Sequence, residues 1–254
     1  MVDIKILSQA ENEIVFVADK ITPAFANAIR RTAMFDVPVL AIEDVYFTKN
    51  SSALYDEIVA HRLGLIPLKT DLKSYNSSDE CSCKGKLCAK CSVKINLKAK
   101  GPATVYAGDL KVKDPDVKVI YPQMPIVKLL EGQEVELEAV AILGKGRKHT
   151  KWSACHIWYR GWPEFTITKE ADLKAATEKI PLEVLKKDGR DLEVKDFSKW
   201  LDSYEAILRA NGIRIENRED KFVFTLESWG QLEPAAILTE AVSILQSKVK
   251  EAKL

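Results

Sequence analysis

A capped amphipathic stretch near the start of the chain, residues 22–35, constrains the fold more than any other feature. Thr22 can accept hydrogen bonds from the first free backbone N–H groups of a helix, and Pro23 suits the first helical position, where no N–H partner is lost. The helix is expected to end before Pro38, because proline disfavours helical geometry in the residue before it. Its apolar face has the spacing i, i+3, i+4, i+7, i+8 and consists of Phe25, Ala28, Ile29, Thr32 and Ala33. The polar side chains that fall largely outside this face, and that an ordinary surface helix would expose to solvent, are Asn27, Arg30 and Arg31.

The charge balance disfavours a protein whose main task is to grip nucleic acid. The 254 residues carry 38 Lys and Arg against 37 Asp and Glu, a net charge of +1, whereas such proteins usually have a clear basic excess. Apolar residues make up 46% of the chain, which is typical of a globular protein with a core. The first residues lack a positive region followed by an apolar core, and no apolar run approaches about 18 residues. We therefore expect a cytoplasmic protein without a membrane span.

Alternation of apolar and polar residues predicts a chain rich in β-strands. The expected strands cover residues 4–7, 14–17, 39–47, 93–97, 135–139, 157–159 and 222–226. Besides the first helix, the expected helices cover residues 55–63, lie around 171–179 and 197–210, and follow Pro234. The last helix has a near-heptad apolar stripe of Leu238, Val242 (or Ala241), Leu245 and Val249, which Ile237 and Ile244 widen. A helix of this kind at a chain end packs on another chain or closes its own core, and the pattern favours neither.

Four cysteines close together form the strongest chemical signal. Cys81, Cys83, Cys88 and Cys91 are spaced C-x-C-x4-C-x2-C. Structural Zn²⁺ takes four ligands in a tetrahedron, and thiolates on a tight loop can supply all of them. The alternatives are two loop disulfides or four free thiols. Cys155 stands apart beside large apolar residues and is expected to be a buried thiol.

A basic loop with two glycines, residues 144–151, could cradle a phosphate or form a solvated surface. Its basic side chains are Lys145, Arg147, Lys148, His149 and Lys151. It lacks the G-x-x-x-x-G-K-[ST] pattern, so a nucleotide P-loop is excluded. No arrangement of the Ser–His–Asp, Cys–His or H-E-x-x-H kind stands out, and we expect no catalytic residues in this chain.

Four segments, in order along the chain, together resemble the alpha-type assembly subunits of cellular RNA polymerase. They are residues 27–31 (NAIRR), 56–68 (DEIVAHRLGLIPL), 144–154 (GKGRKHTKWSA) and 222–230 (FVFTLESWG). The resemblance, which is nearest to the archaeal branch, implies an α+β fold of three parts. A dimerisation domain would combine 1–46, 153–165 and 221–254, with a β-rich domain, 47–152, inserted into it. A small ferredoxin-like module, 166–220, would be a second insert.

The resemblance also implies a function and partners. The chain would be a scaffold in DNA-directed RNA synthesis that pairs with the small alpha-like subunit L and, with subunits N and P, recruits the second-largest polymerase subunit, which is lettered B. The reaction itself would take place in the largest subunits, and contact with DNA would be indirect. The four-cysteine spacing resembles the zinc loop of the eukaryotic counterpart. The implied interface residues are Phe25, Asn27, Ile29, Arg30, Arg31, Lys145, Arg147, His149, Lys151, Leu238, Val242, Leu245 and Val249.

The ferredoxin-like module is expected to hold no iron–sulfur cluster. Such clusters need the run C-x2-C-x2-C-x3-C-P, and no cysteine follows Cys155. Ile180 and Pro181 stand where the last Cys-Pro pair would be. Two other functions remain as alternatives: a stand-alone zinc-loop protein that binds nucleic acid, and a degenerate protein of the ferredoxin type. The balanced charge disfavours the first, and the missing cysteines disfavour the second.

Overall fold

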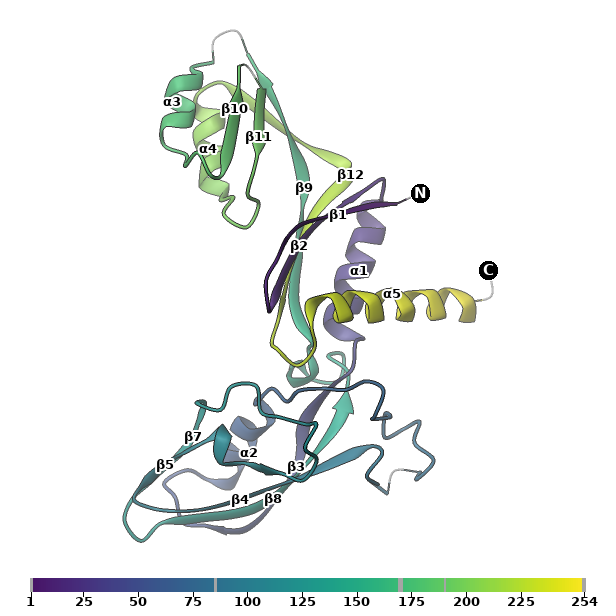
Figure 1. Cartoon of the computed structure of the whole chain (residues 1–254), viewed down its shortest axis with the longest axis vertical. Coiled ribbons are helices and arrows are strands. Elements are labelled where there is room, and N and C mark those ends of the chain that lie inside the picture. The colour runs from purple at the N-terminus through teal and green to yellow at the C-terminus, as the bar shows by residue number, and fades with distance from the viewer. Residues whose placement is uncertain (1, 85, 169–170, 190, 253–254) are drawn as a thin grey trace. The chain divides into compact units, whose positions relative to one another are not determined.

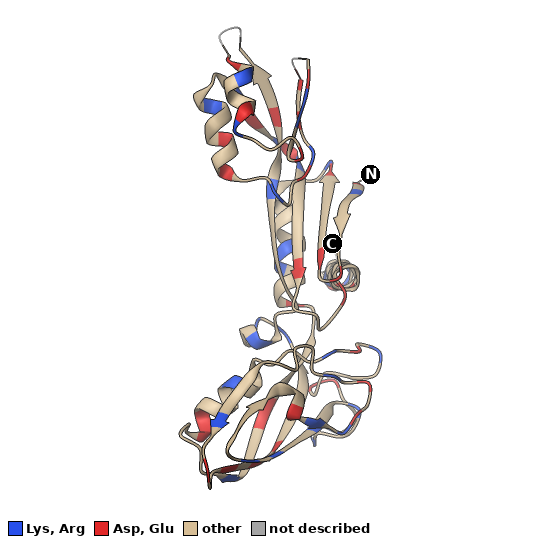
Figure 2. Ribbon diagram, turned by 60° about the vertical axis from the view of Figure 1, so that its left-hand side comes forward, with Lys and Arg blue, Asp and Glu red and all other residues tan. Residues whose placement is uncertain are grey.

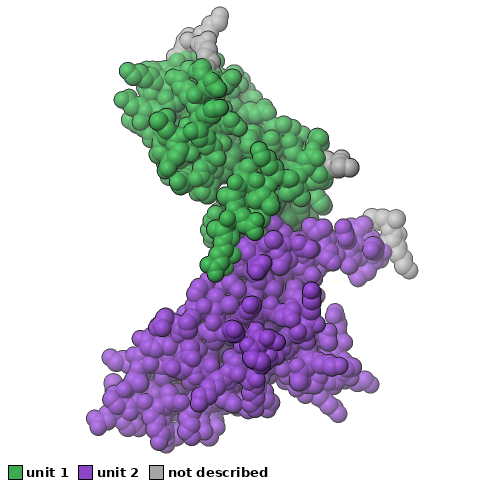
Figure 3. All heavy atoms as spheres, in the orientation of Figure 1, with its two compact units in different colours: residues 1–30, 157–227 green, residues 31–156, 228–254 purple. Residues whose placement is uncertain are grey.

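The computed structural model describes residues 2–84, 86–168, 171–189 and 191–252. The chain is α+β, with antiparallel sheets and few helices. It divides into two compact units (Figure 3). Unit 1 consists of Met1–Arg30 and Ile157–Glu227, and unit 2 of Arg31–His156 and Ser228–Leu254. The domain limits expected from the sequence stay a prediction.

A four-stranded sheet is the centre of unit 1 (Figure 1). Its strands lie in the order β1 (Asp3–Gln9), β2 (Glu13–Asp19), β12 (Ile213–Ser228) and β9 (Cys155–Ile167). Strand β2 pairs antiparallel with both β1 and β12, and the rings of Phe16 and Phe224, opposite each other, stack with centroids 4.9 Å apart. Residues 14–18 are buried on both faces of the sheet, whereas Ile4 and Ile6 on the edge strand β1 are exposed.

The segment between β9 and β12 contributes a small module to unit 1. It contains α3 (Leu173–Glu178), β10 (Leu185–Asp188), β11 (Asp191–Val194) and α4 (Asp202–Ala210), and β10 pairs antiparallel with β11. The Asp172 carboxylate caps α3 by accepting hydrogen bonds from the N–H groups of Lys174 and Ala175, each at 3.0 Å. The module shares one apolar core with the sheet, since Leu208 and Trp200 pack in the same cluster as Val15.

Two sheets and a helix form most of unit 2. The larger sheet has the order β3 (Val39–Asn50), β8 (Glu134–Gly144), β4 (Ser92–Lys100) and β6 (Lys111–Val112), and the smaller one pairs β5 (Ala103–Tyr106) with β7 (Pro125–Leu129). Helix α2 (Asp56–Gly64) packs its Val59 and Leu63 into the same core as Leu40 and Ile95. Short 3-10 helices follow at Ala107–Asp109 and Thr150–Trp152.

Residues of both charge signs occur along the strands of the larger sheet (Figure 2). Cross-strand pairs join Lys94 to Glu138 at 2.8 Å and Lys98 to Glu136 at 2.6 Å. Exposed pairs of this kind contribute little to stability, about 0–1 kcal/mol each. Their main consequence is that the lysines of this face lie beside carboxylates and do not form an uninterrupted basic surface.

The first and last helices begin where the sequence predicts. In α1 (Pro23–Phe35), the Thr22 hydroxyl accepts a hydrogen bond from the Phe25 N–H at 3.2 Å. The buried face of α1 contains Ala26 in place of the predicted Phe25, whose side chain is exposed. Helix α5 (Pro234–Glu251) buries Ile237 and Ala241. Among the described residues, no helix combines the length and the apolar character needed to cross a membrane.

Helix α5 buries the Ile237 and Ala241 side of the widened stripe and leaves its central line less covered. Leu238 and Leu245 are half-buried, Val242 is 43% exposed, and Val249 is 66% exposed. At 3.6 residues per turn, these four side chains lie on one line, about a quarter-turn from Ile237 and Ala241. The helix therefore closes its own unit with one face and presents a second apolar line to solvent.

Candidate functional site

The four cysteine sulfurs lie together at the end of a loop in unit 2. All four Sγ atoms are within 4.8 Å of one another, with separations of 3.6 Å for Cys81–Cys88, 3.6 Å for Cys83–Cys91 and 3.9 Å for Cys88–Cys91. A tetrahedron of thiolates with Zn–S bonds of about 2.3 Å has edges of about 3.8 Å, so the sulfurs fit a bound zinc. A disulfide needs about 2.05 Å, and these cysteines are free. The described geometry therefore does not contain the disulfides considered from the sequence.

The surroundings of the four thiols differ. A hydrogen bond from the Cys88 backbone lowers the pKa of the Cys83 thiol to about 6, and burial raises the pKa of Cys91 to about 12. Lys84 and Leu87, between the two cysteine pairs, have left-handed backbone geometry with φ of 53° and 51°. Such geometry is unfavourable for residues with a side chain and clusters at functional sites. The loop thus bends sharply enough to bring its four sulfurs together.

The basic loop is held against the end of α1 by close packing. An added Cβ at Gly146 would lie 2.6 Å from the Met34 carbonyl oxygen, and one at Gly144 would lie 2.3 Å from the Trp152 ring. The Arg147 N–H donates a hydrogen bond to the Phe35 carbonyl at 3.1 Å. Both glycines are therefore required by packing within the chain, which removes the reason to interpret them as a phosphate cradle.

A buried carboxylate, Asp36, ties three distant parts of unit 2 together. It accepts hydrogen bonds from Arg147, one of them at 3.2 Å, and from the Lys248 ammonium at 2.6 Å. The Asp36 side chain is only 6% exposed. Burial acts to raise the pKa of Asp36, but the hydrogen bonds and charges of Arg147 and Lys248 outweigh it, and the pKa is lowered. The end of α1, the basic loop and α5 thus share one anionic centre.

Replacing this centre should give a pH-dependent loss of stability. The pKa of Asp36 is lower in the folded chain than in the unfolded chain, where it is about 3.9. Its contribution to the free energy of unfolding is therefore fully present above the unfolded-state pKa, and it disappears as pH falls through the folded-state pKa. We expect Asp36→Asn to lower the free energy of unfolding by about 2 kcal/mol at pH 7 and by progressively less toward pH 3. Denaturation across that pH range measures the difference. Glu57→Gln, a change at an exposed carboxylate, is the control, and a pH-independent effect of Asp36→Asn would contradict the assignment.

A second carboxylate, Glu43, pairs with two more cations of the basic loop. Lys148 lies 3.3 Å from it, and Lys151 is in closer contact and also donates to the Ile42 carbonyl at 3.0 Å. The same two ammonium groups lie over the Trp152 ring, 5.1 and 4.4 Å from its centroid. The Lys151 side chain is consequently only 13% exposed. Most of the positive charge of the loop is therefore matched within the chain.

The predicted interface residues differ in how far the structure leaves them exposed. Arg30 donates to the Asn27 side-chain oxygen at 2.9 and 3.2 Å, Ile29 is buried, and Arg147 and Lys151 are ion-paired. The exposed residues are Phe25, Arg31, Lys145, Arg147, His149, Val242 and Val249, and Leu238 and Leu245 are half-buried. Within the part of the chain that the structure describes, Lys145 makes no salt bridge. Sequence reasoning missed Asp36, Glu43 and Lys248, because no local pattern distinguishes them from other surface charges.

Comparison with known proteins gives a consistent family. The model of the RNA polymerase Rpb3/RpoA insert domain matches residues 45–156. The chain is 38% identical to DNA-directed RNA polymerase subunit Rpo3 of Methanothermobacter thermautotrophicus, over 98% of this chain and 97% of the relative. It is 39% identical to Rpo3 of Methanosphaera stadtmanae, over 97% and 95%, and 37% identical to Rpo3 of Thermococcus kodakarensis, over 98% and 95%.

Proposed function

This chain belongs to the family of the Rpo3 subunits of archaeal DNA-directed RNA polymerase, and we propose that it is a non-catalytic assembly scaffold of that enzyme. The observation that carries the proposal is the match over nearly the full length of both chains. The family expected from the four sequence segments is thereby confirmed. Those segments suggest the archaeal subunit lettered D, whereas the relatives carry the name Rpo3.

Pairing with the small alpha-like subunit L is supported by apolar surface that neither unit buries. In unit 2 this surface is the exposed line on α5, which includes Val242 and Val249. In unit 1 it comprises Phe25 on α1 and Ile4 and Ile6 on β1. Exposed apolar patches of this kind usually mark interfaces. Subunits N and P and a cytoplasmic location belong to the same proposal.

Recruitment of the second-largest polymerase subunit is assigned to the polar side of α1 and the basic loop. Within the described residues, Arg31, Lys145 and His149 are exposed and take part in no salt bridge, so they are proposed to make the direct contacts. Arg147 and Lys151 would act by fixing the shape of the loop, because their charges are already satisfied by Asp36 and Glu43. Arginine suits such a surface because its planar group makes several directed hydrogen bonds.

The Arg31→Ala variant tests this division of surfaces. Pairing with L should be unchanged, and capture of the second-largest subunit by the resulting pair should weaken about tenfold, the loss of one good polar contact. Affinity measurements with each purified partner give both numbers. Arg214→Ala, at another exposed arginine, is the control. Loss of L binding with capture of the second-largest subunit intact would contradict the proposal.

The metal and the module complete the proposed structure. Zinc is proposed at Cys81, Cys83, Cys88 and Cys91, with a purely structural role because all four ligand positions come from the chain. The order α3, β10, β11, α4 between β9 and β12 supports a ferredoxin-like module, proposed to be free of an iron–sulfur cluster.

Purification from the native host tests the scaffold role against the two alternative functions, a stand-alone zinc-loop protein and a degenerate protein of the ferredoxin type. Stoichiometric polymerase subunits should co-elute, whereas a chain that elutes alone would favour a stand-alone protein.

A further inference from the structure

The second half of α5 stands largely clear of the core of unit 2. None of the described residues after Ala241 is buried, and Ile244 and Leu245 are half-buried. One link between this end of the helix and the rest of the unit is the Lys248 ammonium, which donates a hydrogen bond to the Asp36 carboxylate at 2.6 Å. A segment with few buried contacts has little local stability of its own. This ion pair therefore has a large influence on where the helix end lies.

Asp36 joins that helix end to the basic loop, residues 144–151. Its carboxylate also accepts hydrogen bonds from the Arg147 guanidinium, one of them at 3.2 Å, and its side chain is only 6% exposed. A buried carboxylate that binds two cations restrains both of them, because withdrawal of either one leaves buried charge incompletely paired. The positions of Lys248 and Arg147 are thus linked through Asp36.

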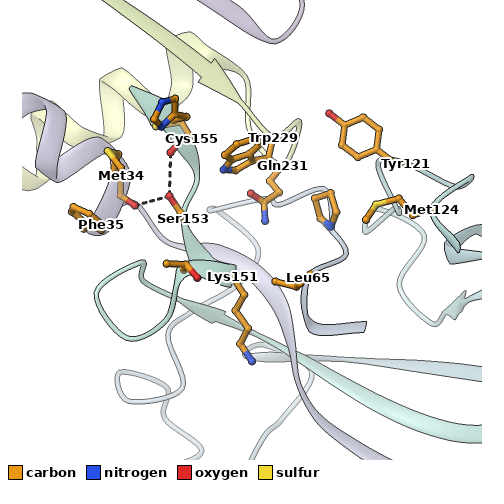
Figure 4. A pocket seen from close by; sticks show the side chains of 13 residues that line it. Met34, Phe35, Leu65, Tyr121, Met124, Lys151, Ser153, Cys155, Trp229 and Gln231 are labelled. Atoms are coloured by element: carbon orange, nitrogen blue, oxygen red, sulfur yellow. Dashed lines mark hydrogen bonds between the residues drawn. The ribbon is translucent and has the colours of Figure 1, made fainter. Parts of the chain in front are cut away.

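Other contacts hold the basic loop to the end of α1 without help from α5. The Arg147 N–H donates a hydrogen bond to the Phe35 carbonyl at 3.1 Å. Just after the loop, the Ser153 hydroxyl lies 3.2 Å from the Met34 carbonyl oxygen (Figure 4). The Lys248 side chain is 47% exposed, so its replacement opens no cavity in the core. Lys248 can therefore be changed without detaching the loop from α1.

A cavity separates α5 from the basic loop next to this ion pair. Glu240 and Ile244 of the helix and Lys145 of the loop line the same cavity of about 580 Å³. Glu240, Ile244 and Lys248 are spaced by four residues, which places them on one side of α5. Because side chains do not fill the space between helix and loop there, the hydrogen bonds of Asp36 help to set the distance between the two elements.

The exposed apolar line of α5 lies on another side of the same helix. Val242 and Val249 are about a third of a turn away from the side that carries Glu240, Ile244 and Lys248. A protein that covers the apolar line would thus contact a side of α5 that does not face the loop, and would still fix the helix that carries Lys248. Rigid secondary-structure elements can transmit such a restraint from one surface to another.

We propose that Lys248 is a positioning residue that couples the two assembly surfaces through Asp36 and Arg147. This coupling rests on the proposed function, in which L covers the apolar line of α5 and the second-largest subunit contacts the basic loop. When L fixes α5, Lys248 holds Asp36 and Arg147 in the arrangement that the second-largest subunit binds. Each partner then strengthens the binding of the other by the same factor, because coupling between binding sites is reciprocal. The coupling sets no order in which the partners bind.

Affinities for the second-largest subunit, measured with and without L, test the coupling. The parent chain paired with L should bind that subunit about tenfold more tightly than the parent chain alone, within the usual range for coupled sites. Lys248→Met should pair with L as the parent does and reduce the ratio to about one. Lys248→Arg, which keeps the cation, should restore most of the ratio. Lys250→Met, at another exposed lysine of α5, is the control and should leave the ratio unchanged.

A comparison between pairs needs no unpaired chain. The Lys248→Met pair should bind the second-largest subunit about tenfold more weakly than the parent pair, whereas the Lys250→Met pair should match the parent. Hydrogen exchange then shows whether the loop itself responds. The Arg147 and Lys148 N–H groups donate to the Phe35 and Lys145 carbonyls at 3.1 and 2.9 Å. Their exchange should be slower in the parent pair than in the Lys248→Met pair, because the loop is less restrained in the variant.

The outcomes separate this coupling from the function on which it rests. If the Lys248→Met pair matches the parent pair in affinity and in loop exchange, the coupling is wrong and the scaffold role stands. If Lys248→Met fails to pair with L, Lys248 belongs to the pairing surface, and the coupling is also wrong. If the parent chain binds neither partner, the proposed function itself fails.

Discussion

Aspartate at both Val242 and Val249 is expected to abolish pairing with the small alpha-like subunit. Both side chains lie on the exposed apolar line of α5, and a partner that covers this line would bury two uncompensated charges. Each such charge costs about 3–5 kcal/mol, so pairing should weaken more than about a hundredfold. Co-expression of the variant with L, followed by affinity purification, should recover no L. The fold of the chain should be unaffected, because neither valine is part of its own core.

The control places the same two charges elsewhere on the same helix. Ser243 and Ser247 are exposed and lie on the side of α5 away from the apolar line. The Ser243→Asp, Ser247→Asp variant should therefore retain L at the yield of the parent. Full recovery of L with the Val242, Val249 variant would show that this line is not the pairing surface. Loss of L with both variants would instead indicate damage to the helix.

Serine at both Cys83 and Cys91 is expected to remove one zinc per chain and to unfold the loop around it. Structural zinc contributes about 10–16 kcal/mol of apparent binding free energy in isolated zinc-finger peptides. Here the loop adjoins a domain with its own apolar core, so the loss should be confined to residues near 71–91. Metal analysis should give about one zinc for the parent and none for the variant. Limited proteolysis should cut the variant within the loop and spare the parent.

A single change at Cys155 provides the matched control. This thiol is fully buried away from the four-cysteine cluster, and burial raises its pKa to about 12, which disfavours the thiolate that metals bind. Cys155→Ala should keep the zinc. Iron and acid-labile sulfide in anaerobically purified parent, lost together with Cys83 and Cys91, would mean that the loop holds a cluster instead of zinc. Unchanged zinc in the double variant would mean that the metal lies elsewhere.

The small core of the inserted module shows where patterns along the chain mislead. The sequence places a helix at 197–210, but α4 begins only at Asp202, and Phe197 and Trp200 pack into the core before it. Leu182 and Leu201 are large apolar residues of the kind that usually form a core, yet both are exposed. In a module this small, a few turns decide which apolar side chains reach the interior. Local propensity is a weak guide to that choice, because tertiary packing overrides it.

Neighbouring residues alone determined the features that the sequence predicted well. The start and end of α1 depend on Thr22, Pro23 and Pro38, which act within one helical turn. The four-cysteine cluster is equally local, because its ligands lie within one loop. Only the tertiary structure decided the rest. Asp36 accepts hydrogen bonds from Arg147 and Lys248, which are 111 and 212 residues away in the sequence. No short-range sequence pattern predicts contacts between residues so far apart. Burial is likewise set by distant partners, which is why Ile29 is buried while Phe25 and Val249 stay exposed.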